Sequence, residues 1–159
     1  MKPQIIVKRY PYEEPYLTQI EFTVSNDVFS GHTDIYCNVE DLREIGKALQ
    51  NFPNKIDDEY IYEYGSEKPE DRYYRHFWLK VYTVNSFGRC AIQFHINKNT
   101  QEPDEGICRF SILAEASAVN NLGKMFERFS ELKHLEFRWS PEESELFKTH
   151  QIEEKLWQI

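Results

Sequence analysis

The chain has 159 residues, of which 40% are hydrophobic and 15% aromatic, and its 19 basic and 27 acidic side chains give a formal net charge of −8. This composition excludes a disordered chain and predicts one domain with its own core. Phosphate backbones repel an acidic surface, so we expect no nucleic-acid partner. No apolar run approaches the roughly 20 residues of a membrane span, and none near the start suits a signal peptide. We therefore expect no membrane association and a cytoplasmic location.

The first half of the chain predicts a set of strands and then a helix. A short strand is expected at 5–9, and apolar and polar residues alternate over 17–24, as in a half-buried strand. After a turn, a strand returns over 28–37. Asn38 then suits a helix N-cap, and the helix has one apolar face and ends before Pro53.

The second half predicts more strands, a second helix and a tail. In order, we expect strands at 60–64, 73–84, 89–97 and 107–114 and a helix at 115–132, with polar loops at 65–71 and 98–106. A final strand is expected at 135–139. Pro141 followed by two glutamates suits the start of a helix that runs to about Trp157. A helical tail over 133–159 is the prediction.

A sequence pattern occurs twice. The first copy has an apolar helix face with a central Gly-Lys pair, and the second copy follows 77 positions later. The paired residues are Leu42, Ile45, Gly46, Lys47, Leu49 and Phe52, and then Val119, Leu122, Gly123, Lys124, Phe126 and Phe129. This indicates a duplicated β-β-α unit, over about 17–53 and about 89–132, on either side of strands at 59–84.

Both central glycines lie inside the predicted helices, where glycine costs roughly 1 kcal/mol relative to alanine. We therefore expect each glycine to allow a close approach to another element. The predicted fold is α+β and forms a single domain over 1–159. It has an antiparallel sheet with two helices packed on one face, followed by the helical tail.

One face of the predicted sheet has the composition of a binding surface. If residues 85–88 form a four-residue turn, Phe77 lies opposite Ile96 and this apolar face meets the helices. Aromatic and polar side chains then lie together on the opposite face: Tyr74, His76, Trp78, Lys80, Tyr82, Gln93, His95 and, from the next strand, Arg109. Tyr, Trp and Arg are enriched in binding hot spots, so we predict a partner here. Alternatively, a terminal segment covers this face.

The sequence has no motif that indicates catalysis. Both Gly-Lys pairs lie inside helices, which excludes a phosphate loop, and Glu115 reads as a helix cap. His76 and His95 approach each other across the hairpin, but no carboxylate is evident as a third metal ligand. Cys37, Cys90 and Cys108 read as small buried thiols. We expect no catalytic residue, metal or cofactor, and no enzyme.

The order of elements resembles the WapI-like bacterial immunity proteins and related small bacterial domains. The matching stretches run from Val39-Glu40-Asp41-Leu42 through Phe52-Pro53 and from Phe110-Ser111-Ile112 through Ala118, with the strands between them. The resemblance covers about 17–132 and identifies no residue roles. It implies a protein that binds and neutralises a toxin domain.

The leading hypothesis is a non-catalytic protein-binding domain, with a basic toxin domain as the partner that suits an acidic chain. Three alternatives stay open. One is a structural or regulatory domain with another protein partner. The second is a small-ligand binder that uses the aromatic sheet face, and the third is an enzyme.

Overall fold

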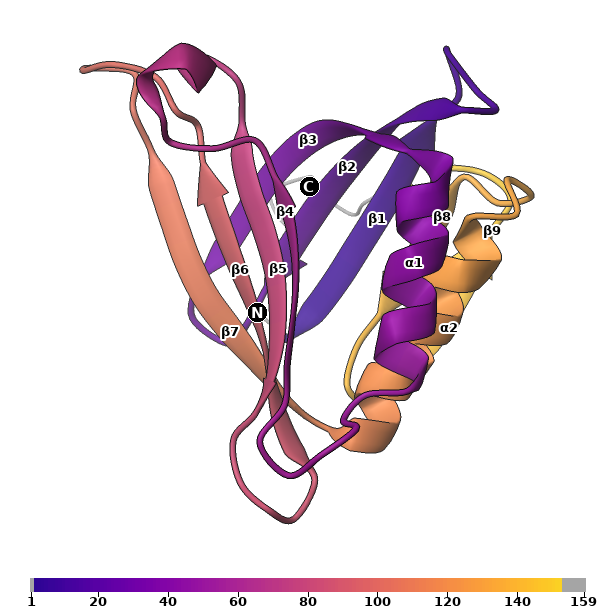
Figure 1. The fold of residues 1–159 in the computed structure, drawn as a ribbon. Coiled ribbons are helices and arrows are strands. Elements are labelled where there is room, and N and C mark those ends of the chain that lie inside the picture. Colours follow the sequence, from indigo (N-terminus) through magenta and orange to yellow (C-terminus); the bar gives the residue numbers. More distant parts are fainter. Residues whose placement is uncertain (1, 153–159) are drawn as a thin grey trace, which may run out of the picture.

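The chain forms two antiparallel sheets and two helices in a computed structural model that describes residues 2–152 (Figure 1). Sheet A has the strand order β3-β2-β1-β8-β9, and sheet B has the order β4-β5-β6-β7. The strands of sheet A are β1 (Gln4–Tyr10), β2 (Leu17–Ser25), β3 (Ser30–Asn38), β8 (Glu136–Trp139) and β9 (Ser144–Phe147). Those of sheet B are β4 (Glu59–Tyr64), β5 (His76–Thr83), β6 (Arg89–Asn97) and β7 (Ile107–Glu115). The helices are α1 (Val39–Gln50) and α2 (Ala116–Phe129), and a short 3₁₀ turn, η1, covers Pro69–Asp71.

The α+β class and the antiparallel pairing are confirmed, and the strands divide between two sheets where we expected one. Each sheet has one apolar face, and these faces bury each other. The Phe22 ring in β2 stacks on the Phe77 ring in β5 with centroids 4.6 Å apart, and Phe126 of α2 lies 6.5 Å from Phe22. The helices lie side by side at one side of the two sheets and close the core there (Figure 1).

The repeat is present in the structure and is longer than the predicted unit. Strands β3 and β7, 77 positions apart, have the same pattern of burial, and each runs directly into a helix. Each unit comprises three strands, a helix and a further strand, namely β1-β2-β3-α1-β4 and β5-β6-β7-α2-β8. The last strand of each unit joins the sheet of the other, because β4 pairs with β5 and β8 pairs with β1.

The two repeated glycines form the contact between the helices, as expected from their place in the helix interior. A Cβ atom at Gly46 would lie 2.6 Å from the backbone nitrogen of Glu127. A Cβ atom at Gly123 would lie 2.6 Å from the backbone nitrogen of Gln50 and 2.7 Å from the carbonyl oxygen of Gly46. Gln50 and Glu127 are themselves repeat equivalents, 77 residues apart, and Gln50 donates to Glu127 across the contact at 3.0 Å. The two helices therefore meet about a local pseudo-twofold axis.

Polar contacts define both ends of α1. Asn38 and Asp41 form a capping box at its start, as the sequence predicts. At its end, the side-chain nitrogen of Asn120 in α2 donates to the carbonyl oxygens of Leu49, Gln50 and Phe52. The last carbonyls of a helix lack the N–H donors of a following turn, and α2 supplies a donor to these three. The Leu49 carbonyl also accepts from the backbone nitrogen of Phe52 at 3.3 Å.

The prediction of a helical tail is wrong for the residues that the structure describes. The strand at 135–139 is confirmed as β8, but Ser144–Phe147 forms β9 and pairs with it. The segment that resembles a helix start is the turn of this hairpin. The Ser140 hydroxyl accepts from the backbone nitrogens of Glu142 and Glu143, which favours the turn over a helix. Residues 153–159, where the predicted helix ends, lie outside the described residues.

All three cysteines are free, with Cys37 and Cys90 buried and Cys108 partly buried. Burial raises the pKa of each thiol, to about 12 for Cys37. The expectation of buried thiols is confirmed for Cys37 and Cys90 but not for Cys108. A thiol with a raised pKa is a poor nucleophile, because the thiolate is the reactive form.

We expect the substitution Gly46→Ala to destabilise the fold. Alanine favours a helix by about 1 kcal/mol, but its Cβ would meet the backbone of α2, and overpacking against backbone costs about 1–3 kcal/mol. Because backbone atoms cannot move aside, we expect the upper part of this range, and urea unfolding should show a net loss of about 1–2 kcal/mol. The matched control is Lys47→Ala, at an exposed position of the same helix, which should change stability by less than about 0.5 kcal/mol. A G46A protein as stable as the wild type would contradict the close contact.

Candidate functional site

The outer face of sheet B points away from sheet A and the helices, and it carries the predicted binding residues. The hairpin register is as expected, with Phe77 opposite Ile96, Trp78 opposite His95 and Lys80 opposite Gln93. Arg109 joins from β7, opposite His95. The structure therefore brings all the predicted residues except Tyr74 together on this face: His76, Trp78, Lys80, Tyr82, Gln93, His95 and Arg109. Tyr74 is exposed in the loop before β5.

Trp78 holds the centre of this face through three contacts. Its ring stacks on His95 with centroids 4.0 Å apart and an interplanar angle of 19°. The Arg109 guanidinium carbon lies 4.7 Å from the centroid of the indole, within the range of a cation–π contact. The indole nitrogen faces the Gln93 side chain at 3.4 Å. These contacts orient large, partly exposed side chains before any partner arrives.

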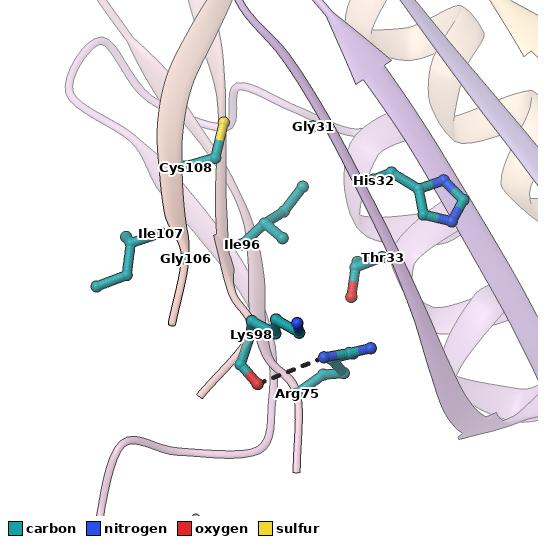
Figure 2. A pocket seen from close by; sticks show the side chains of 9 residues that line it. All are labelled: Gly31, His32, Thr33, Arg75, Ile96, Lys98, Gly106, Ile107 and Cys108. Atoms are coloured by element: carbon teal, nitrogen blue, oxygen red, sulfur yellow. Dashed lines mark hydrogen bonds between the residues drawn. The ribbon is translucent and has the colours of Figure 1, made fainter. Parts of the chain in front are cut away.

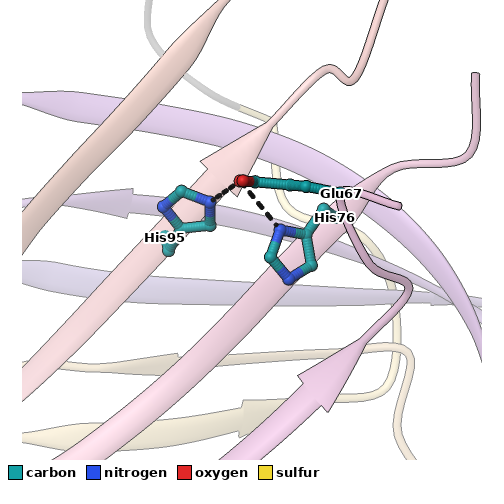
Figure 3. Close-up of side chains that lie close together, drawn as sticks. All are labelled: Glu67, His76 and His95. Atoms are coloured by element: carbon teal, nitrogen blue, oxygen red, sulfur yellow. Dashed lines mark hydrogen bonds and ion pairs between the residues drawn. The ribbon is translucent and has the colours of Figure 1, made fainter. Parts of the chain in front are cut away.

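A carboxylate from outside the sheet reaches the two histidines. Glu67 lies in the loop between β4 and β5, and its Oε1 atom lies 3.1 Å from His76 Nδ1 and 2.9 Å from His95 Nε2 (Figure 3). Asn97 donates to the same oxygen at 3.0 Å. We call Glu67, His76 and His95 the Glu67 cluster. Both histidines are buried, at 4% and 1% exposure, whereas half of the Glu67 side chain is exposed.

The hydrogen-bond partners assign the protons of the cluster. Arg109 donates to His95 Nδ1 at 3.2 Å, so His95 carries its proton on Nε2 and donates to Glu67. His76 faces a carboxylate with each nitrogen, because its Nε2 lies 2.8 Å from Glu63. Both His76 nitrogens therefore have a carboxylate oxygen as hydrogen-bond partner.

The charges and hydrogen bonds of the cluster change two pKa values. Hydrogen bonds from Asn97, His95 and His76 lower the pKa of the Glu67 carboxyl to about 2. Burial lowers the pKa of His95, and the positive charges of Arg109 and His76 act in the same direction, against the hydrogen bond to Glu67. Glu67 is therefore an anion that is held by three donors over a wide pH range.

The loop that carries Glu67 has a defined conformation. Gly65 has a φ of +71° and is closely packed, since a Cβ atom there would lie 2.4 Å from the carbonyl oxygen of Arg75. The Asn99 side chain donates to the carbonyl oxygens of Ser66, Asp71 and Tyr74, which spans the whole loop. Sequence reasoning missed Glu67 because it is one of several acidic residues in a polar loop, and no local pattern distinguishes it.

The repeat supplies an internal comparison for this face. In sheet A, the positions equivalent to Trp78, His95 and Arg109 follow from the strand pairing and carry Ile6, Thr23 and His32. The same strand arrangement therefore accepts different side chains at these three positions in the two sheets. The fold does not require the Trp78–His95–Arg109 row.

A second feature is a cleft of about 320 Å³ between β3 of sheet A and the β6–β7 hairpin of sheet B (Figure 2). It is lined by Gly31, His32, Thr33, Arg75, Ile96, Lys98, Gly106, Ile107 and Cys108. Arg75 contacts the carbonyl oxygen of Lys98 at 3.5 Å. The hydroxyl of Thr33 is buried and has no partner. No nucleophile–base pair is found among these lining residues.

Comparison with known proteins identifies no family. Neither a protein-family model nor a curated protein matches the sequence. Among solved structures, the chain is similar to the plant transcriptional regulator PBF-2, with a TM-score of 0.46 and 9% identity over 82% of this chain and 76% of that one. A likeness of this size supports no statement about function. In the part of the chain that the structure describes, no helix is long and apolar enough to cross a membrane.

We expect Glu67→Gln to remove part of the acid sensitivity of the fold. A carboxyl with a lowered pKa stabilises the native state above its unfolded value of 4.5, and this contribution is lost as the pH falls toward about 2. Because half of the side chain is exposed, solvent screening should limit the contribution to about 1 kcal/mol or less. Urea unfolding at pH 5.5 and 2.5 measures it.

The matched control is Glu70→Gln, an exposed glutamate in the same loop. The stability difference between wild type and E67Q should shrink at the lower pH, whereas E70Q should follow the wild type at both. If the E67Q difference were the same at the two pH values, the carboxylate would not be held by the cluster.

Proposed function

We propose that this chain is a non-catalytic protein-binding domain that docks a basic protein on the outer face of sheet B. The observation that carries the proposal is the oriented Trp78–His95–Arg109 row at the centre of that face. Exposed apolar side chains surround it, with Ile61 at 48%, Ile107 at 67% and Leu113 at 51% exposure. Tryptophan and arginine anchors inside an apolar surround are typical of binding hot spots.

Two basic side chains of the face already have acidic partners. Lys80 lies 3.7 Å from Glu59, and Arg89 lies 3.0 Å from Glu115. A partner that covers this face therefore does not leave Lys80 or Arg89 buried without a counter-ion, which would otherwise oppose binding. The Arg89–Glu115 pair lies at the end of the face and the aromatic residues lie at its centre, which matches the usual anatomy of protein interfaces.

The whole-chain charge supports a basic partner. A net charge of −8 attracts cationic proteins over distances of about 10 Å and accelerates their encounter at low salt. A basic toxin domain of the kind that immunity proteins neutralise is such a partner. The resemblance to the WapI-like immunity proteins supports this choice.

The partner can be sought by affinity capture from the source organism with a tag that lacks histidines, followed by titration of the purified candidate. We expect Leu113→Lys to weaken binding at least about tenfold, because it places a positive charge in the apolar surround facing a basic protein. The control is Tyr16→Lys, which makes the same charge change at an exposed residue of the β1–β2 loop. It should change affinity less than about threefold, through long-range charge alone.

Two results would contradict the proposal. Equal losses for L113K and Y16K would show that charge, and not this face, determines the binding. An association rate that does not fall with added salt would contradict a basic partner, since steering between opposite charges is screened by salt.

A further inference from the structure

We propose that the Glu67 cluster binds a divalent transition-metal ion, with Zn²⁺ as the metal that best fits its ligands. The site goes beyond the docking proposal and needs no partner. Its three ligand atoms, Glu67 Oε1, His76 Nδ1 and His95 Nε2, all lie within 4.8 Å of one another. Two imidazoles and a carboxylate form a ligand set that zinc proteins use, with a fourth position for water.

The separations are close to those that the metal requires. Zinc bonds of 2.0–2.1 Å in a tetrahedron place neighbouring ligand atoms about 3.3 Å apart. Glu67 Oε1 now lies 2.9 Å from His95 and 3.1 Å from His76. A shift of a few tenths of an ångström would open the site, and the half-exposed Glu67 side chain can provide it. His76 Nδ1 and His95 Nε2 lie within 4.8 Å of each other, on adjacent strands with ring centroids 5.0 Å apart. The two rings would therefore have to turn toward the ion by up to about 1.5 Å.

The surroundings of the cluster also suit a metal site. Histidine ligands usually donate their second nitrogen to a carboxylate, which orients the ring and increases its basicity. Glu63 stands in that position, 2.8 Å from His76 Nε2. Asn97 holds the ligating oxygen of Glu67 in the same way. On binding, the ion would replace the protons that now lie between Glu67 and the two rings. Each ring would keep one proton on its other nitrogen, and any further proton would leave to solvent.

Arg109 opposes this binding. A metal on His95 Nε2 requires the proton on Nδ1, where Arg109 now donates at 3.2 Å. Two donors cannot face each other, so the guanidinium would have to turn away from His95. Since Arg109 also lies over Trp78, metal binding would change the centre of the docking face. Arg109 is thus a residue that sets the affinity of the site and couples it to the surface above.

The experiment titrates tag-free protein with Zn²⁺ by calorimetry, and with Co²⁺ as a spectroscopic probe of the coordination geometry. We expect one ion per chain and the intense visible absorption of four-coordinate Co²⁺. Glu67→Gln should weaken binding at least about tenfold, and Glu63→Gln about 10–100-fold through the outer contact to His76. Arg109→Met should tighten binding, because it removes the competing donor and a positive charge. Glu70→Gln, in the same loop, should bind like the wild type.

Three outcomes would overturn the proposal. They are a wild-type dissociation constant weaker than about 100 μM for Zn²⁺, equal affinities for E67Q and E70Q, and a six-coordinate Co²⁺ spectrum that no variant alters. Any of them would make the cluster a hydrogen-bond network alone. Far-UV circular dichroism of each variant separates a lost site from a lost fold. None of these measurements contains a protein partner, so they are independent of the docking proposal.

Discussion

The close approach of two helix backbones at Gly46 and Gly123 is the constraint on which the rest of the structure depends. Each glycine faces backbone atoms of the other helix at distances that exclude any side chain. Because each helix follows directly from an edge strand, β3 or β7, the contact also fixes how the two sheets face each other. The two sheets bury their apolar faces against each other beside this contact between the helices, with Phe22 and Phe77 in direct contact.

The strand exchange makes the two halves depend on each other. Neither unit completes its own sheet, because β4 pairs in sheet B and β8 in sheet A. Strand β8 is also tied to the helix of its own unit, since the Trp139 indole donates to the carbonyl oxygen of Ala118 at 2.9 Å. Separating the halves would expose two sheet edges and the apolar faces together. We therefore attribute the arrangement to shared burial and not to either unit alone.

Alternation and helical periodicity predict most strands and both helices correctly, whereas contacts between distant segments do not follow from them. Alternation over the hairpin predicts that Trp78 lies beside His95, because side chains alternate strictly between the faces of a strand. The division into two sheets and the place of Glu67 depend on contacts between distant segments. The loop around Glu67 takes its shape from Asn99, which is 25 to 33 residues from the carbonyls that it binds. At the tail the local signal is itself ambiguous, because residues 141–143 suit a helix start and a hairpin turn equally, and the Ser140 hydroxyl favours the turn.

Comparison of the two repeat units distinguishes the residues that the fold needs from those that it does not need. Inward-facing residues of the two units share one pattern of burial, as β3 and β7 show. The outer rows differ, with Ile6, Thr23 and His32 in one sheet and Trp78, His95 and Arg109 in the other. Burying two histidines and an asparagine on the outer face opposes folding unless every polar atom has a partner. The other sheet carries Gln4, Thr23 and Ser25 at the positions equivalent to His76, His95 and Asn97. The fold therefore does not need the histidines for stability, and this difference supports a binding role for the outer face of sheet B.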